Sequence, residues 1–185
     1  MAEFRIETER LILRDWRDSD WQPFFEGSNT PAVMRWLGGV MDDDKQARQR
    51  ERLEGYSRDN GHTFWAVERK DDGALLGFCG IKRANLPGGP QGDFEAGWRL
   101  REDAWGKGYA REGAQASLRH AFTRLDAPHV IALTVPGNSA SWGLMERLGM
   151  ERRPDIDFTD FASNPDDGKV IAYRLARSAW ENMNG

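Results

Sequence analysis

The chain has 185 residues, of which 39% are hydrophobic and 30% charged, and this length and composition suit one soluble globular domain, which we expect over residues 3–182. Its formal net charge of −4 argues against general nucleic-acid binding, which needs a basic surface. No apolar run reaches the length of a membrane span, the N-terminus lacks the apolar core of a signal peptide, and a lone cysteine excludes an intrachain disulfide, so we expect a cytoplasmic protein without membrane partners.

The N-terminal quarter predicts one strand followed by two helices. Residues 6–14 alternate in polarity and contain β-branched side chains, which is typical of a strand. The acids of residues 18–20 offer an N-cap to a helix beginning at Trp21. Residues 42–44, three aspartates, precede a polar helix over 45–58. Acids at a helix start suit the dipole, so we favour that reading over a metal site.

The middle of the chain predicts three strands. Residues 63–68 and 74–82 are two of them, and the Asp-Gly within residues 70–73 predicts a hairpin between them. The apolar setting of Cys79 in the second strand indicates a buried side chain rather than a nucleophile. Residues 85–92 form a loop rich in glycine and proline, and 93–100 form the third strand.

The last part alternates helix and strand. Residues 106–125 place apolar side chains on one helical face, and 129–135 form a β-branched strand. Asn138 or Ser139 caps a helix that ends near Gly149, and 169–175 form a last strand. This order of elements predicts an α/β fold, a mixed sheet with helices on its faces.

Residues 105–110, WGKGYA, carry the clearest chemical signal. Glycine lets the backbone approach a ligand, and the first N–H groups of a helix, which have no internal partner, favour an anion. The segment therefore predicts a cradle for a pyrophosphate. A P-loop needs Ser or Thr after its Gly-Lys, but Gly108 stands there. A dinucleotide fingerprint needs a third glycine and a later acid within a βαβ unit, and only two glycines are present.

Four segments in order then resemble the GNAT N-acetyltransferase superfamily, and most closely its ribosomal-protein alanine and serine N-acetyltransferase branch. They are residues 8–14 (TERLILR), 94–100 (FEAGWRL), 105–112 (WGKGYARE) and 138–150, which begins NSAS and ends ERLGM. The resemblance implies a splayed central sheet, opened by a bulge over residues 98–100, with acetyl-coenzyme A in the opening and no metal.

The resemblance also implies which residues bind the cosubstrate. Backbone groups of Trp98 and Leu100 would pair with the pantetheine arm, and Asn138 would orient a pantetheine amide unless it only caps its helix. The pyrophosphate would lie against backbone N–H groups of Gly106, Lys107, Gly108, Tyr109, Ala110 and Arg111. The side chains of Lys107 and Arg111 add charge there or are simply solvated.

In this chemistry an amine attacks the thioester directly, and a general base takes its proton. Glu95 is the first candidate base, with a salt bridge as the alternative; Glu112 is the second, although a first-turn acid that stabilises the helix is favoured for it. The Leu100 N–H would face the oxyanion. Many members carry a tyrosine at the position of Met145, and the resemblance assigns contact with the leaving sulfur to Ser141 instead, with a hydroxyl bonded to backbone as its alternative.

The resemblance implies that the acceptor is a primary amine, either a protein N-terminus or a small molecule. Trp36 and the aromatic residues of the first helix are candidates to line its site, although most aromatics at helical spacing belong to the core. A non-catalytic acyl-coenzyme A sensor is the alternative from another class. The sequence leaves a homodimer open.

Overall fold

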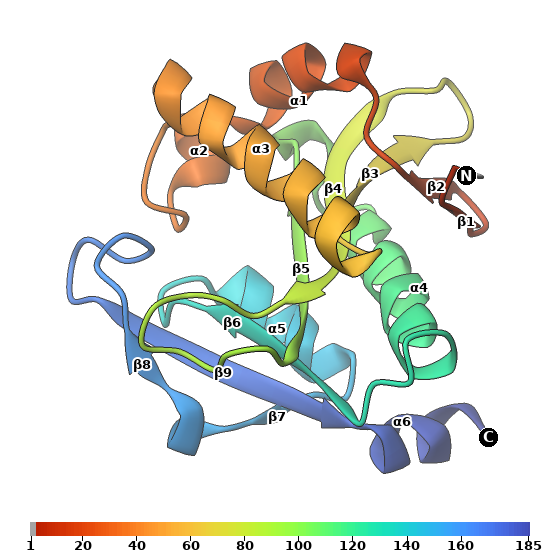
Figure 1. Cartoon of the computed structure of the whole chain (residues 1–185), viewed down its shortest axis with the longest axis vertical. Coiled ribbons are helices and arrows are strands. Elements are labelled where there is room, and N and C mark those ends of the chain that lie inside the picture. The colour runs from red at the N-terminus through yellow and green to blue at the C-terminus, as the bar shows by residue number, and fades with distance from the viewer. Residues whose placement is uncertain (1–2) are drawn as a thin grey trace.

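A computed structural model, which describes residues 3–185, places the strands in one mixed sheet with helices on both faces (Figure 1). The strands are β1 (Arg5–Glu7), β2 (Leu11–Arg14), β3 (Phe64–Arg69), β4 (Leu75–Arg83), β5 (Phe94–Leu100), β6 (His129–Thr134), β7 (Glu151–Arg152), β8 (Phe158–Thr159) and β9 (Lys169–Ala176). The α-helices are α1 (Trp21–Ser28), α2 (Pro31–Met34), α3 (Asp43–Asn60), α4 (Tyr109–Thr123), α5 (Ser139–Arg147) and α6 (Arg177–Asn184), and short 3-10 turns lie at Asp18–Asp20, Glu102–Ala104 and Pro154–Ile156.

The strands follow the order β1-β2-β3-β4-β5-β6-β9-β7, with β8 paired to β9 beside this path. Neighbouring strands are antiparallel except β5 and β6, which are parallel. A parallel pair needs a crossover connection, and α4 supplies it. The predicted mixed α/β fold is confirmed.

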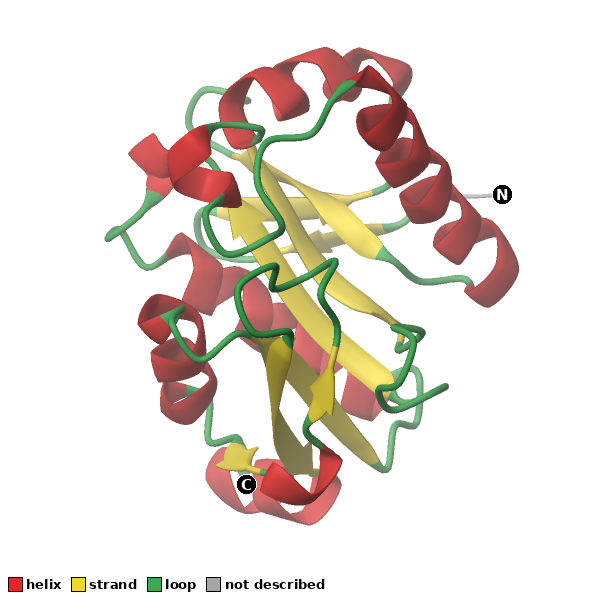
Figure 2. Cartoon of the chain, turned by 90° about the vertical axis from the view of Figure 1, so that its left-hand side faces the viewer, coloured by secondary structure: helices red, strands yellow, loops and turns green. Residues whose placement is uncertain are grey.

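The two faces of the sheet carry separate apolar clusters. Helices α4 and α5 pack on one face, where their apolar stripes join buried residues such as Trp65 and Ile81. On the other face, α1 and α3 cover a smaller aromatic cluster that includes Phe24, Phe64 and Phe78. Figure 2 shows these helices lying over the sheet on opposite sides.

The first strand predicted from the sequence is a hairpin of two strands. β1 and β2 pair with one another, and residues 8–10 turn between them. Asp20 occupies the expected N-cap position of α1, but its side chain makes no capping bond to that helix. Its carboxylate instead binds Arg14, with Nη1 of the guanidinium 2.7 Å from Oδ2. Asp42 does cap α3, accepting from the backbone N–H of Lys45.

Four further elements were not predicted, namely α2, α6, β7 and β8. The strands β7 and β8 have two residues each, which is too short for an alternating pattern. Within residues 3–185, no helix has the length and apolar character to cross a membrane.

The bulge expected at residues 98–100 is not there. The register of β5 against β4 is unbroken, from the pair formed by Phe94 and Arg83 to the pair formed by Leu100 and Gly77. The register shift lies instead between β3 and β4, where Leu76 is the extra residue. Gly77 then has φ +144°, and a Cβ at this position would lie 2.0 Å from the carbonyl oxygen of Arg99. Only glycine allows that approach.

The sheet nevertheless opens as expected, by divergence rather than by a bulge. β5 pairs with β6 only through Phe94–Val130 and Glu95–Ile131. Beyond these pairs the strands run apart, and Figure 1 shows β5 and β6 leaving one another at an angle. The gap widens toward their C-terminal ends, where α4 and α5 begin.

Candidate active site

The backbone edge of β5 that faces this gap belongs to Trp98 and Leu100. The N–H of Arg101 donates to the Leu76 carbonyl across the β4–β5 ladder. Because hydrogen-bonded positions alternate in an antiparallel ladder, odd-numbered residues of β5 point their backbone groups at β4, and even-numbered ones point away from it. Since pairing with β6 ends at Glu95, the N–H groups of Trp98 and Leu100 face the opening. The Leu100 carbonyl is engaged by the indole N–H of Trp105 at 2.9 Å.

A tight turn at the wide end of the gap leads into α4. Gly106 and Gly108 have φ +70° and +80°, a left-handed backbone that suits glycine. The helix therefore begins at Tyr109, three residues later than predicted, and its first backbone bond runs from the N–H of Glu112 to the Gly108 carbonyl. The N–H groups of the intervening first turn have no partner within the helix, a geometry that favours an anion.

Arg10 and Glu112 hold that turn in place. The Glu112 carboxylate accepts from the Thr8 hydroxyl at 2.6 Å, from the Arg10 backbone N–H at 2.8 Å and from Arg10 Nε at 2.7 Å. Arg10 Nη1 also donates to the Lys107 carbonyl at 2.8 Å, and its guanidinium lies over the Tyr109 ring. Burial raises the pKa of Glu112, but the bonds from Thr8 and Arg10 outweigh it and lower that pKa. All of this favours the structural interpretation of Glu112 over a role as base.

The basic side chains near the turn differ in how they are engaged. Lys107 Nζ donates to the Asp103 carbonyl at 2.9 Å, so its ammonium is folded back over the preceding 3-10 turn. Arg111 is exposed on the first turn of α4. Both side chains belong to residues at the start of the helix, where the dipole also favours negative charge.

Glu95 lies at the narrow end of the gap, on the face that α1 and α3 cover. Its side chain is buried, and Lys82, its register partner on β4, places Nζ 2.8 Å from Oε2. Lys82 Nζ is also bonded to Asn85 Oδ1 at 2.9 Å. Burial raises the pKa of Glu95, and Lys82 opposes that shift only in part. The salt bridge anticipated as an alternative is present, and a carboxylate with a raised pKa is also suited to accept a proton near neutral pH.

The other wall of the gap is the start of α5. Asn138 occupies the N-cap position of α5, but its side chain makes no capping bond. Capping therefore does not explain why an asparagine stands at this position. Ser141 is half-buried in the first turn, and its backbone N–H donates to the Asn138 carbonyl at 3.1 Å. Met145, where many family members carry a tyrosine, is buried in the core and has no hydroxyl to offer a leaving sulfur.

A loop from the N-terminal half crosses the wide end of the gap on the α1 side. Met34, at the end of α2, contacts Arg99 on β5 through its sulfur. Two residues on, the Trp36 ring packs against Gly137, where a Cβ would lie 2.5 Å from the ring. Trp36 is a candidate lining residue from the sequence analysis, and its ring lies against Gly137, next to Asn138.

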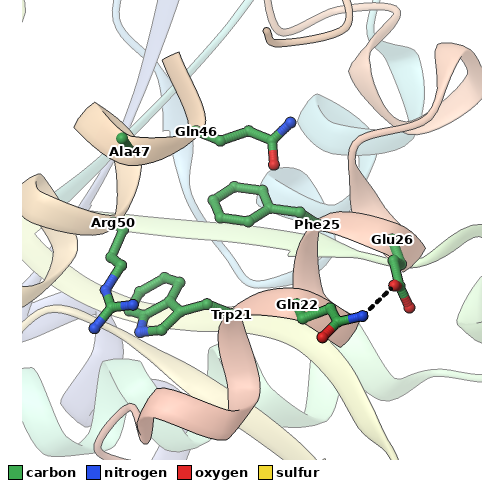
Figure 3. Close-up of a pocket in the computed structure, with 7 residues that line it drawn as sticks. All are labelled: Trp21, Gln22, Phe25, Glu26, Gln46, Ala47 and Arg50. Atoms are coloured by element: carbon green, nitrogen blue, oxygen red, sulfur yellow. Dashed lines mark hydrogen bonds between the residues drawn. The ribbon is translucent and has the colours of Figure 1, made fainter. Parts of the chain in front are cut away.

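One cavity lies away from this arrangement. It has a volume of about 420 Å³ and lies between α1 and α3 (Figure 3). Its lining residues are Trp21, Gln22, Phe25, Glu26, Gln46, Ala47 and Arg50. None of them belongs to β5, β6, α4 or α5, so this cavity takes no part in the gap.

Sequence reasoning missed two residues of this region. Arg10 lies within a segment that carried the resemblance, but only its contacts with Glu112 and Lys107 reveal its role. Arg99 was passed over, although an arginine at a buried strand position is itself a signal. In the described part of the chain, no three or more His, Cys, Asp or Glu side chains gather as a metal site would require.

Comparison with known proteins agrees with this geometry. A family model described as an acetyltransferase (GNAT) domain matches residues 10–151. The chain is 33% identical over 155 residues to an uncharacterized protein of Bacillus subtilis, YkkB, covering 80% of this chain and 86% of that protein. It is 29% identical to the uncharacterized N-acetyltransferase YnaD of the same organism, covering 80% and 82%. An acetyltransferase crystal structure from Agrobacterium tumefaciens superposes with a TM-score of 0.80 at 26% identity, covering 95% of both chains.

Proposed function

Because the chain belongs to the GNAT acetyltransferase family and is an acetyl-coenzyme A-dependent acyltransferase, we propose that it transfers the acetyl group directly to a primary amine. The acceptor amine belongs to a protein N-terminus or to a small molecule. The transfer takes place in a ternary complex, without a covalent enzyme intermediate. Residues 3–182 form one catalytic domain in this proposal.

The observation that carries the proposal is the unpaired backbone edge of Trp98 and Leu100 beside the turn at Gly106–Gly108. A pantetheine arm carries amides that pair with such an edge like an added strand. Its pyrophosphate then lies at the start of α4, against backbone N–H groups from Gly106 to Arg111. Asn138, on the facing wall, is free to bond an amide of the arm.

Glu95 is the proposed general base. An α-amino group has a reference pKa of roughly 8 and a lysine one of roughly 10.4, so an α-amino group gives up its proton more readily. The buried carboxylate lies where β5 and β6 part, and a proton from an amine in the gap would reach it through intervening water. Lys82, with Nζ 2.8 Å from Oε2, opposes the rise that burial causes in the pKa of Glu95 and so favours the ionised form.

The tetrahedral intermediate and the leaving thiolate need fixed donors. The Leu100 N–H faces the gap and is the proposed oxyanion donor. Ser141 is the proposed contact to sulfur. Because a thiol has a pKa of about 8.5, its departure demands little assistance, and a hydroxyl suffices.

The test is coenzyme release with a panel of peptide N-termini, polyamines and other amines, for the wild type and Glu95→Gln. We expect kcat to fall about 10²- to 10⁴-fold in the variant, the usual contribution of a general base, with the Kd for acetyl-coenzyme A unchanged. Glu102→Gln, an exposed acid in the 3-10 turn after β5, is the control and should keep full activity. Equal turnover by Glu95→Gln and the wild type would remove Glu95 from the mechanism.

A further inference from the structure

Arg99 is a buried cation that the fold leaves unpaired. Its side chain is 6% exposed on β5, and Nε and Nη2 find no hydrogen-bond partner among the described residues. Nη1 donates to the thioether sulfur of Met34 at 3.1 Å, a weak acceptor. The guanidinium otherwise lies near the rings of Phe24 and Phe78, 4.8 and 5.0 Å from their centroids.

Arg14 shows how the same fold treats a buried arginine with a structural role. It is 4% exposed, comparable to Arg99. Its guanidinium binds Asp20 at 2.7 Å and Glu68 at 2.8 Å. No acid among the described residues forms an ion pair with Arg99, and burial together with the charge of Arg52 lowers the pKa of Arg99 to about 10. A buried unpaired charge is costly, and a methionine or leucine would fill the position better, so packing alone does not explain Arg99.

The position of Arg99 relates it to the reaction. Side chains alternate along a strand, so Arg99 and Glu95 lie on the same face of β5, the one covered by α1 and α3. Their Cα atoms are about 13 Å apart, from four residues at roughly 3.3 Å each. Glu95 marks the narrow end of the gap, and Arg99 lies at its wide end.

The loop over Arg99 spans the same gap. Met34 lies on Arg99 at the β5 side, and Trp36 lies on Gly137 at the β6 side. Leu37, the next residue, is 45% exposed, so the crossing is at the surface. A molecule that enters from this side and displaces the Met34 sulfur meets Nη1 of a guanidinium whose Nε and Nη2 are also without a partner among the described residues.

We propose that Arg99 binds an anionic group of the acceptor, so that the enzyme acts on amines whose molecules also carry a carboxylate or a phosphate. The inference rests on the proposed amine transfer. An acidic group of either kind accepts two parallel N–H bonds from a guanidinium, which matches the unpartnered Nε and Nη2. With the anion held at Arg99 at the wide end, the amine extends into the gap along β5, in the direction of Glu95.

The test uses matched pairs of acceptors. The probes are glycine, 4-aminobutanoate, 6-aminohexanoate and phenylalanine, each compared with its carboxamide, together with 3-aminopropylphosphonate. For the wild type we expect kcat/KM at least tenfold higher for the best carboxylate or phosphonate than for its neutral counterpart. Whether carboxylate or phosphonate is preferred identifies the kind of anion. In Arg99→Met the preference disappears, mainly through KM, while Arg52→Met, an exposed arginine near it, keeps the preference.

Equilibrium binding of the same probes to the protein with coenzyme A separates this inference from the proposed function. Binding of the anionic probes that is lost in Arg99→Met, without turnover of any amine, supports the anion site and contradicts the amine transfer. Turnover that is equal for anionic and neutral probes in the wild type contradicts the role of Arg99 and leaves the transfer intact. That comparison needs no variant, so it decides even if Arg99→Met fails to fold, and Arg99→Lys gives a second variant that keeps the charge but loses the paired donors.

Discussion

The contact between Glu112 and Arg10 gives the sharpest prediction, because one carboxylate ties α4 to the β1–β2 turn. Glu112→Gln keeps an oxygen for Thr8 and for the Arg10 N–H, but it turns an amide NH₂ toward Arg10 Nε, donor against donor. Bonds to a charged group contribute about 1.5–3 kcal/mol each, and the Arg10 side chain is 40% exposed, which weakens its share. We expect a loss of about 2 kcal/mol in the free energy of unfolding, measured by urea denaturation at pH 7.

The pH dependence checks the cause. The pKa of Glu112 is lowered from 4.5 in the folded protein. Its contribution to the free energy of unfolding is therefore fully present above pH 4.5 and is lost as the pH falls through the pKa of the folded state. The stability difference between wild type and Glu112→Gln should therefore shrink below pH 4.5. Glu9→Gln, an exposed acid in the same turn, should change little. A difference below about 0.5 kcal/mol at pH 7, or one that persists in acid, would refute the reasoning.

Three other outcomes follow from the site and the core. Gly108→Ala and Gly92→Ala both force a left-handed φ, +80° and +79°, but only the first lies at the phosphate turn and meets Arg10 Nη2 at 3.3 Å. Calorimetry should show weaker coenzyme A binding for Gly108→Ala alone, and equal affinities would remove the turn from the binding site. Because Glu95 must be ionised to act and its pKa is raised, kcat/KM should rise with pH through that pKa, and a flat acid limb would count against it. Burial raises the pKa of Cys79 to about 12, so a thiol reagent should modify it only after denaturant is added; rapid labelling of the native protein would contradict its burial.

Local sequence signals predicted much of the fold. The strands β3 to β6 and β9, the hairpin at Gly73 and the helices α3 to α5 lie within a few residues of their predicted bounds, because each has a clear periodicity and a turn or cap residue at its end. The opening of the sheet was also expected, through the family resemblance. The bulge was misplaced because Leu76, the extra residue, and Gly77 beside it look in the sequence like ordinary residues of an apolar strand.

Contacts between distant segments could not be predicted. Glu112 and Arg10 are 102 residues apart in sequence, and no local pattern joins them. Lys82 opposes Glu95 because of the register that the loop between β4 and β5 imposes, and a shift of one residue would have separated them. The sequence therefore identified residues by type and order, and left their partners to the folded structure.

The short parallel seam between β5 and β6 has a mechanical consequence. Only Phe94 and Glu95 join the two halves of the sheet along their strands. A cosubstrate that pairs with Trp98 and Leu100 on one side and with the start of α5 on the other would link the two halves of the sheet and stabilise them against separating. Hydrogen exchange should then show the β6–β9 half opening separately when the protein is alone, and the two halves exchanging as one unit when coenzyme A is bound. The acetyl donor would thus complete the contacts between the two halves of the sheet each time it binds, and remove them each time it leaves.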